Sequence, residues 1–183
     1  MVIMDENFKG AGQKEGIEMW RIKDFKALKV DRKEYGVFYC GDSYIVLNTK
    51  INQEWDVHFW LGSETTQDEM GTAAIKTVEL DEALGGGPVQ YREVQDHESS
   101  LFLSYFKSGI KYLQGGHDSG FTHVGDEKFE PRLLQCKGKR NVRVRQVPLS
   151  RDSLNLGDVF LLDLGDQVYV WCPPDSGRLE RIK

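Results

Sequence analysis

Apolar and polar residues alternate in several short segments of the first half of the chain. Residues 17–22 have this period of two, and two further apolar segments follow at 37–39 and 43–48. The alternation returns in residues 55–61, so residues 48–54 are expected to form the turn of a β-hairpin. These segments predict neighbouring β-strands, and residues 43–48 are apolar enough to lie at the centre of a sheet.

The period changes in residues 66–84, where a helix is predicted. Thr66 and Glu69 have the spacing of a capping box, and the run Gly-Gly-Gly-Pro at 85–88 ends the helix. At about 100° per residue, one stripe collects the residues expected to face the core: Met70, Ala73, Ala74, Thr77, Leu80 and Leu84. Ile75 lies outside this stripe on a charged face. It is either an incidental exposed residue or a contact for an apolar groove on a partner.

The remaining segments complete the expected fold class. Residues 89–93 predict another strand and residues 99–106 a short second helix, while strand-like segments continue beyond Gly120. Residues 1–16 are polar and rich in glycine, so we expect an extended N-terminal arm. A sheet with one long and one short helix is an α+β domain.

The sequence contains an internal repeat. Residues 41–47 (GDSYIVL) are similar to 157–163 (GDVFLLD), and 57–60 (VHFW) are similar to 168–171 (VYVW). In each copy, an acidic residue follows nine positions after the tryptophan. Two copies of strand, strand and acid therefore keep the same register outside one loop.

This repeat places acidic residues in pairs that suit a metal ion. A Gly-Asp pair at the start of a strand and a Glu in the first turn of a helix can bring together two carboxylates and a backbone carbonyl. Calcium takes 6–8 oxygen ligands of these kinds. The first copy offers Gly41, Asp42 and Glu69, and the second offers Gly157, Asp158 and Glu180. The alternative is structural: Gly-Asp makes a turn, Glu caps a helix, and shared ancestry preserves the pattern.

Asp81 indicates a second kind of site. A carboxylate in the last turn of a helix opposes the helix macrodipole, and a nearby cation would remove this penalty. The glycines after it can turn their carbonyls toward the same point, so a further calcium site is predicted here.

Composition excludes several classes of protein. With 183 residues, 39% hydrophobic and 29% charged, the chain suits one soluble domain and part of another. The net charge of −5 argues against general nucleic-acid binding, and no apolar run approaches the roughly 20 residues that span a bilayer. No secretory signal is visible. The three cysteines are far apart and form no CxxC motif, which favours a reduced, cytosolic chain.

An enzyme is not expected, since the four histidines lack the spacing of metal ligands and the glycine run is not a phosphate-binding loop.

Several motifs resemble the first repeat of the gelsolin, villin, severin and fragmin family. They are GDSYI at 41–45, FWLG at 59–62, TQDE at 66–69, KTVELD at 76–81, VQYRE at 89–93, YFKSG at 105–109 and GGHDSGF at 115–121. From about Arg132 the chain is similar to the start of the second repeat, and FKGAGQ at 8–13 looks closest to the severin and fragmin branch. The resemblance implies an arm at 1–16, a first gelsolin-like domain at 17–124, a linker at 125–131 and an incomplete second repeat at 132–183.

The resemblance also implies site residues. A calcium ion within the first domain would be held by Asp42, Glu69 and the carbonyls of Gly41 and His117. A second calcium, shared with actin, would use Asp81 with the carbonyls of Gly86 and Pro88. The long helix would enter a cleft of actin, with Ile75 and Phe121 as apolar anchors. Six basic residues would bind phosphoinositide headgroups: Lys107, Lys111, Arg132, Lys137, Lys139 and Arg140. The presence of these basic residues is explained equally well by a solvated loop or by a contact with the filament.

The family's fold is a mixed sheet between a long and a short helix, and its activity is calcium-activated capping and severing of actin filaments without covalent catalysis. We therefore expect a cytoplasmic, cytoskeletal protein that binds actin monomers and caps filament barbed ends, with severing dependent on the segments beyond the first domain. The alternative is a calcium-independent module that depolymerises actin or sequesters monomers. Because the second repeat reaches only Lys183, we expect an exposed sheet face and edge there, and only the first of the two repeated calcium sites is expected to be complete.

Overall fold

The computed structural model describes residues 4–116, 130–139 and 141–182. The chain divides into two compact units, each described here by itself. The first contains the residues up to Tyr35 together with Tyr39–Tyr105, and the second contains Gly36–Phe38 and Phe106–Lys183. This division falls earlier than residue 124, where the resemblance places the end of the first domain. The domain limits drawn from sequence therefore stay a prediction.

A five-stranded sheet forms the centre of the first unit, in the order β2-β1-β4-β5-β6. Its strands are β1 (Gly16–Lys23), β2 (Lys26–Lys29), β4 (Ser43–Thr49), β5 (Trp55–Leu61) and β6 (Val89–Val94). Every pair is antiparallel except β5 with β6, which is parallel. The sheet is therefore mixed, and the central position predicted for residues 43–48 is confirmed.

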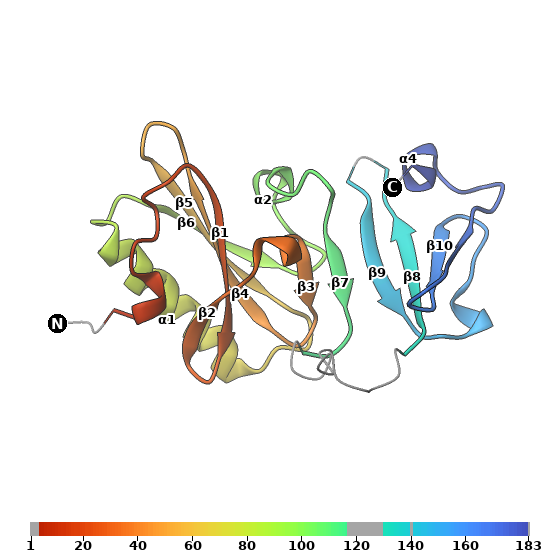
Figure 1. The fold of residues 1–183 in the computed structure, drawn as a ribbon, viewed down its shortest axis with the longest axis horizontal. Coiled ribbons are helices and arrows are strands. Elements are labelled where there is room, and N and C mark those ends of the chain that lie inside the picture. Colours follow the sequence, from red (N-terminus) through yellow and green to blue (C-terminus); the bar gives the residue numbers. More distant parts are fainter. Residues whose placement is uncertain (1–3, 117–129, 140, 183) are drawn as a thin grey trace. The chain divides into compact units, whose positions relative to one another are not determined.

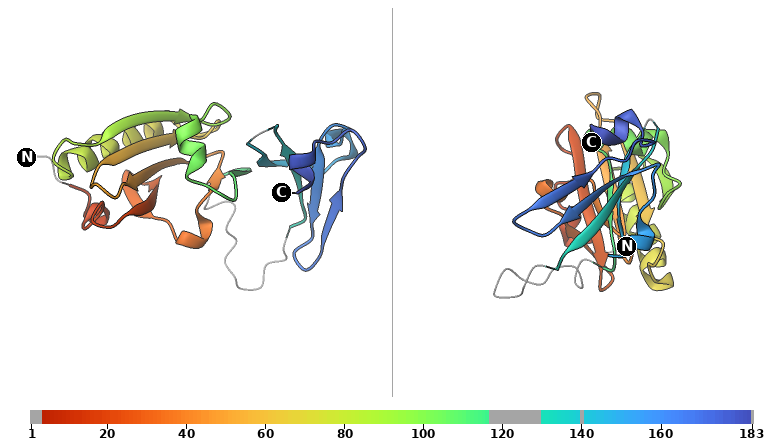
Figure 2. Two further views of the ribbon diagram at one scale, coloured as in Figure 1. Left: turned by 90° about the horizontal axis from the view of Figure 1, so that it is seen from above. Right: turned by 90° about the vertical axis from the view of Figure 1, so that its right-hand side faces the viewer.

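Two helices lie on opposite faces of this sheet. The long helix α1 (Gln67–Ala83) packs across β1, β2, β4 and β5 (Figure 1 and Figure 2). Val57 and Leu61 of β5 enter the core on the α1 side. His58, which follows Val57 in the strand, points to the opposite face of the sheet and contacts Phe102 of the short helix α2 (Ser100–Ser104). The expected α+β arrangement, a mixed sheet between one long and one short helix, is confirmed.

The N-terminal segment differs from the extended arm that its composition predicted. Residues Glu6–Phe8 form a short 3-10 helix, η1, and Phe8 is only 2% exposed. The Phe8 ring meets Trp20 edge-on at 5.3 Å, and the Trp20 indole N–H donates to the Asn7 carbonyl at 3.0 Å. Phe8 and the nearby Ala11 therefore anchor this segment in the core, although most of its other residues are polar or glycine.

The second unit is built on a six-stranded sheet in the order β11-β10-β8-β9-β7-β3. Its strands are β3 (Val37–Tyr39), β7 (Lys111–Leu113), β8 (Arg132–Lys137), β9 (Arg143–Val147), β10 (Val159–Asp163) and β11 (Val168–Trp171). Short helical turns lie at η2 (Arg32–Glu34) in the first unit and at η3 (Arg151–Ser153) and α4 (Arg178–Arg181) in the second. All four residues of the edge strand β11 are exposed, by 40% to 60%. This matches the exposed edge expected for the second repeat. In the described part of the chain, no helix is both long and apolar enough to cross a membrane.

Candidate cation sites and an exposed helix face

Asp42 stands directly before β4 and is 7% exposed. Its Oδ2 accepts a hydrogen bond from the Tyr44 hydroxyl at 3.2 Å and lies 3.8 Å from Nη1 of Arg21. Burial, followed by the charge of Asp42, raises the pKa of Tyr44, so the hydroxyl keeps the proton that it donates. The carboxylate of Asp42 is thus held in a fixed position.

The turn that carries Asp42 is joined to the loop leading into α1. The Gly62 amide donates to the Asp42 carbonyl at 3.1 Å, and the Glu64 amide donates to the Cys40 carbonyl at 2.8 Å. A Cβ on Gly62 would collide with the Cys40 carbonyl, so this close approach requires glycine. These bonds bring Asp42 and the N-terminus of α1 to the same end of the sheet.

Glu69 completes the capping box predicted from sequence, because its amide donates to Thr66 Oγ1 and its Oε2 accepts from the Thr66 amide at 3.0 Å. Oε2 also accepts from the Thr65 hydroxyl at 3.1 Å, and that hydroxyl lies 2.9 Å from Oγ of Ser43, the neighbour of Asp42. All hydrogen bonds from the described residues to this carboxylate end on Oε2. Its Oε1 is therefore open to another ligand.

Asp42 and Glu69, two predicted ligands of the first site, thus lie on segments joined by hydrogen bonds, and their oxygens suit a cation that prefers oxygen. Two carboxylates and the Gly41 carbonyl come from adjoining segments, which is the donor chemistry of calcium. No group of three or more His, Cys, Asp or Glu side chains that could hold a metal occurs among the described residues, so backbone carbonyls would have to complete the shell. Three predicted site residues lie outside the described part of the chain: His117, Phe121 and Arg140.

Asp81, in the last turn of α1, has a carboxylate oxygen without a partner among the residues that the structure describes. Its Oδ1 is buried and unbonded, whereas Oδ2 accepts from the side-chain amide of Gln90 at 2.6 Å. The next loop has Gly85 and Gly86 at φ values of +83° and +74°, and the Gly86 amide donates to the Asp81 carbonyl. Leaving a buried carboxylate oxygen unsatisfied costs free energy, and a cation would remove that cost. Asp81 and the loop that ends at Pro88 therefore fit the predicted second cation site.

The acidic pair of the second repeat differs from the first in that protein donors reach both oxygens of its glutamate. Asp158 Oδ2 accepts from the side chains of Gln135 at 2.6 Å and Asn155 at 2.8 Å. Glu180 accepts from the Gly138 amide through Oε1 and from the Gly177 amide through Oε2, both at 2.8 Å. Both carboxylates thus already have hydrogen-bond donors. The predicted pair beside Gly157 is less open to a cation than the pair in the first unit.

The exposed face of α1 carries apolar side chains. Ile75 is 62% exposed and Val78 is 46% exposed, whereas Ala73, Thr77 and Leu80 are fully buried. The core stripe predicted from the helical period is thus confirmed in its centre, and Ile75 lies outside it. Val78 was missed by the sequence reasoning, although its spacing of three residues from Ile75 places both on one face.

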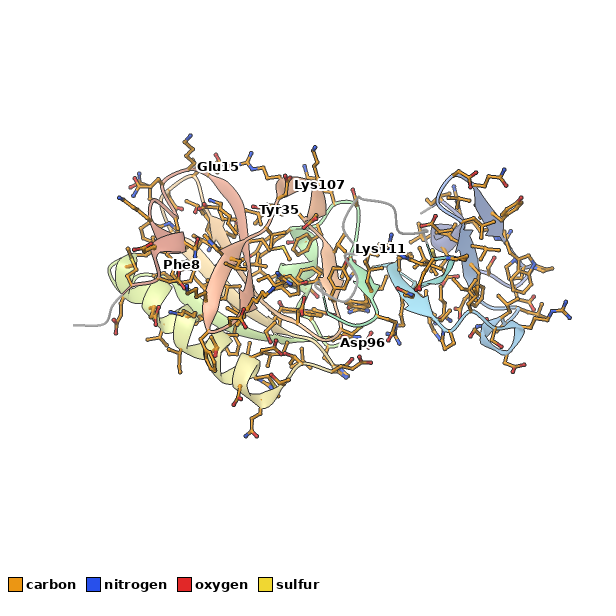
Figure 3. The ribbon with its side chains drawn as sticks, turned by 60° about the horizontal axis from the view of Figure 1, so that its bottom comes forward. Phe8, Glu15, Tyr35, Asp96, Lys107 and Lys111 are labelled. Carbon is orange, nitrogen blue, oxygen red and sulfur yellow. The ribbon has the colours of Figure 1, made fainter. Side chains whose placement is uncertain are left out.

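The basic residues predicted to bind phosphoinositides are spread over the second unit. Arg132 and Lys137 are the first and last residues of β8, so they lie roughly 17 Å apart. Lys111 is half-buried on β7, with exposed Lys107 just before that strand (Figure 3). Burial lowers the pKa of Lys111, and the charge of Asp163 opposes this shift. Among the described residues, the predicted set is therefore not a single cluster.

The family model and the similar proteins found by comparison all point to the same family. The model of the gelsolin repeat matches residues 24–103 and 140–183. Gelsolin-like protein 1 of Caenorhabditis elegans is 55% identical over 182 residues, which cover 98% of this chain and 38% of that protein. The cytoplasmic gelsolin of Homarus americanus is 56% identical over 180 residues, covering 96% of this chain and 24% of that protein. The actin depolymerising venom protein gelsolin 1 of Platymeris rhadamanthus is 54% identical, covering 97% of this chain and 49% of that protein. The chain thus spans half or less of the length of these relatives.

Proposed function

The chain belongs to the gelsolin family, and we propose that it is an actin-binding protein whose binding is controlled by calcium. It binds actin monomers and caps filaments at the barbed end, and severing is a further activity that a filament assay separates from capping. It acts by binding and not as an enzyme, in the cytoplasm at the actin cytoskeleton. One relative is named for depolymerising actin and another as cytoplasmic, which supports this proposal. Membership of the severin and fragmin branch within the family stays a prediction.

The exposed face of α1 is the observation that carries the actin proposal. Ile75 and Val78 are exposed although the opposite face of the helix is fully packed against the sheet. An amphipathic helix that shows a second apolar strip can place it in a groove of a partner, where a well-packed apolar anchor supplies much of the binding energy. In this proposal Ile75 is the central contact with actin, and Phe121 is a second anchor.

Calcium is proposed to act at two places in the first unit. Asp42, Glu69 and the Gly41 carbonyl would hold one ion, with His117 as a further carbonyl ligand. Bound there, calcium would tie the N-terminus of α1 to the turn before β4 and so fix the helix that meets actin. Asp81 would hold the second ion, shared with actin, with the carbonyls of Gly86 and Pro88, near the exposed face of the same helix. At both places the chain's own groups supply only oxygen ligands.

The second unit is proposed to have subsidiary roles. Gly157, Asp158 and Glu180 form a weaker calcium site, because protein donors reach both oxygens of Glu180, whereas those on Glu69 reach only Oε2. The basic residues of this unit would bind phosphoinositide headgroups through charge-assisted hydrogen bonds. Since Arg132 and Lys137 lie at opposite ends of β8, such binding would use separate contacts, not one pocket.

The test is co-sedimentation with actin filaments, together with monomer binding, in calcium and in a calcium chelator. We expect binding and barbed-end capping in calcium, and a loss of both in chelator. Binding that is equally tight in chelator would reject calcium control and favour the calcium-independent depolymerising or sequestering module. No binding in either condition would reject the actin proposal itself.

A further inference from the structure

The N-terminal segment, residues 5–12, touches the C-terminal end of α1 through Gly12. The Gly12 carbonyl accepts a hydrogen bond from the indole N–H of Trp55 at 3.1 Å, and its amide donates to Glu18 Oε2 at 2.8 Å. Gly12 has a φ of +71°, and a Cβ there would lie 2.7 Å from both Leu84 Cδ2 and Trp55 Nε1. Only glycine therefore allows residues 5–12 to sit this close to Trp55 and to the residue that ends α1.

Trp55 in turn supports the loop after α1. A Cβ built on Gly87 would lie 3.5 Å from Cζ3 of Trp55, so the backbone of this loop rests against the indole ring. The same loop begins directly after Leu84, which packs against the core. The loop is thus held on two sides by groups that contact Gly12. A third restraint, the bond from the Gly86 amide to the Asp81 carbonyl, ties it back to the helix.

These contacts matter because the loop carries the carbonyls assigned to the cation site. Asp81 contributes one buried carboxylate oxygen that has no partner in the described part of the chain, and the other proposed ligands of the chain are the backbone carbonyls of Gly86 and Pro88. Gly85 and Gly86 both have positive φ, so without outside contacts this segment has many conformations available to it. Groups outside the ligand shell that fix the ligands commonly change metal affinity about tenfold or more.

We propose that residues 5–12 act as a clasp that fixes the Gly85–Pro88 loop through Trp55, so that Gly12 and Trp55 are positioning residues for the Asp81 cation site. The proposal rests on the calcium site proposed at Asp81. It gives the N-terminal segment a part in calcium binding, although it supplies none of the ligands. The anchoring of Phe8 on the sheet, beside α1, keeps the clasp in place (Figure 3).

The experiment is a calcium titration of the full chain bound to monomeric actin, which is expected to share the Asp81 ion, followed by the backbone amide resonances of each site. Gly86 and Gly87 report the Asp81 site, and Gly41 and Asp42 report the other. The key variant is Gly12→Ala, whose methyl group pushes the clasp away from Trp55 and Leu84. Its control is Gly10→Ala, because Gly10 has a similar φ of +79° but nothing within 4 Å of the added Cβ.

We expect Gly12→Ala to weaken calcium binding at Gly86 and Gly87 by about tenfold, with no change at Gly41 and Asp42. Gly10→Ala should leave both affinities unchanged. If Gly12→Ala fails to fold, Trp55→Phe tests the same point, since it removes the indole donor to the Gly12 carbonyl and reduces the ring surface beside Gly87.

Unchanged affinity at Gly86 and Gly87 in Gly12→Ala, or in Trp55→Phe if that variant is needed, would overturn the clasp while leaving the calcium site intact. A different result identifies failure of the site itself. In that case, the Gly86 and Gly87 resonances of the unsubstituted chain would not respond to calcium, or would respond equally in Asp81→Asn. That result would reject the clasp's role together with the site.

Discussion

His58 and Glu93 form a buried hydrogen-bonded pair in the first unit, with Nδ1 of the ring 2.8 Å from Oε1 of the carboxylate. The other ring nitrogen lies 3.0 Å from the Tyr105 hydroxyl, which donates to Asp56 at 3.3 Å. Tyr91 stacks on the imidazole at 4.6 Å. This polar chain links β5 and β6 to the end of α2 on the face of the sheet opposite α1. It therefore holds the short helix in place through directed bonds as well as apolar packing.

This network makes stability dependent on pH. Burial raises the pKa of Glu93, but the hydrogen bonds from His58 and Ser99 outweigh it and leave the pKa below its ordinary value of 4.5. A carboxylate with a lowered pKa in the folded state adds stability above the unfolded pKa, and this is lost as pH falls through the folded value. Glu93→Gln should therefore reduce the free energy of unfolding by about 2 kcal/mol at pH 7. Thermal or urea unfolding measured at neutral pH and again below 4.5 checks this, because the difference should shrink in acid. A difference that stays constant with pH would contradict it.

Glu69 provides a test of the first calcium site that separates its two possible roles, as a calcium ligand and as a helix cap. Glu69→Gln keeps a residue that suits the third position of a capping box but removes one ligand charge, so the helix should persist while calcium affinity falls about tenfold or more. Asp68→Asn is the matched control, since it removes the same charge from an exposed side chain in the same helical turn. Calorimetric titration of the two variants checks the site. Equal affinities would assign Glu69 to capping alone, the structural alternative for this position.

Much of the first unit could be predicted because its signals are local. The alternation from Trp55 to Leu61 places every second side chain on one face, and the structure puts that face against α1. The capping box at Thr66 and Glu69 depends on residues three apart, so sequence alone locates the start of the helix. The proximity of Asp42 to Glu69 was inferred from the repeat, whereas the reason for it lies in Gly62, whose lack of a side chain lets two distant loops meet.

Other features depend on contacts between distant segments and leave no period in the sequence. Parallel pairing of β7 with β9 joins residues more than thirty positions apart and could not be anticipated from either strand. Polar composition hid the packing of residues 5–12, because it depends on a few scattered residues, Phe8, Ala11 and Gly12, that contact distant parts of the chain. The hydrogen bonds from the Gly138 and Gly177 amides to Glu180 likewise could not be predicted from the sequence, since backbone donors carry no sequence signature.

The proposed contact with actin can be tested at Ile75, since this side chain is exposed and adds little to the core. Ile75→Asp should weaken actin binding by about 2 kcal/mol or more, roughly thirtyfold, because a charge would enter an apolar groove of the partner. The melting temperature should stay near that of the unsubstituted chain, because the side chain is 62% exposed. Ile51→Asp is the matched control: Ile51 is 85% exposed on the turn between β4 and β5, outside α1, and its substitution should leave binding unchanged. Equal binding by both variants would remove Ile75 from the interface. Equal weakening would indicate a general effect of added negative charge, and a loss of folding in Ile75→Asp alone would show that this residue belongs to the core.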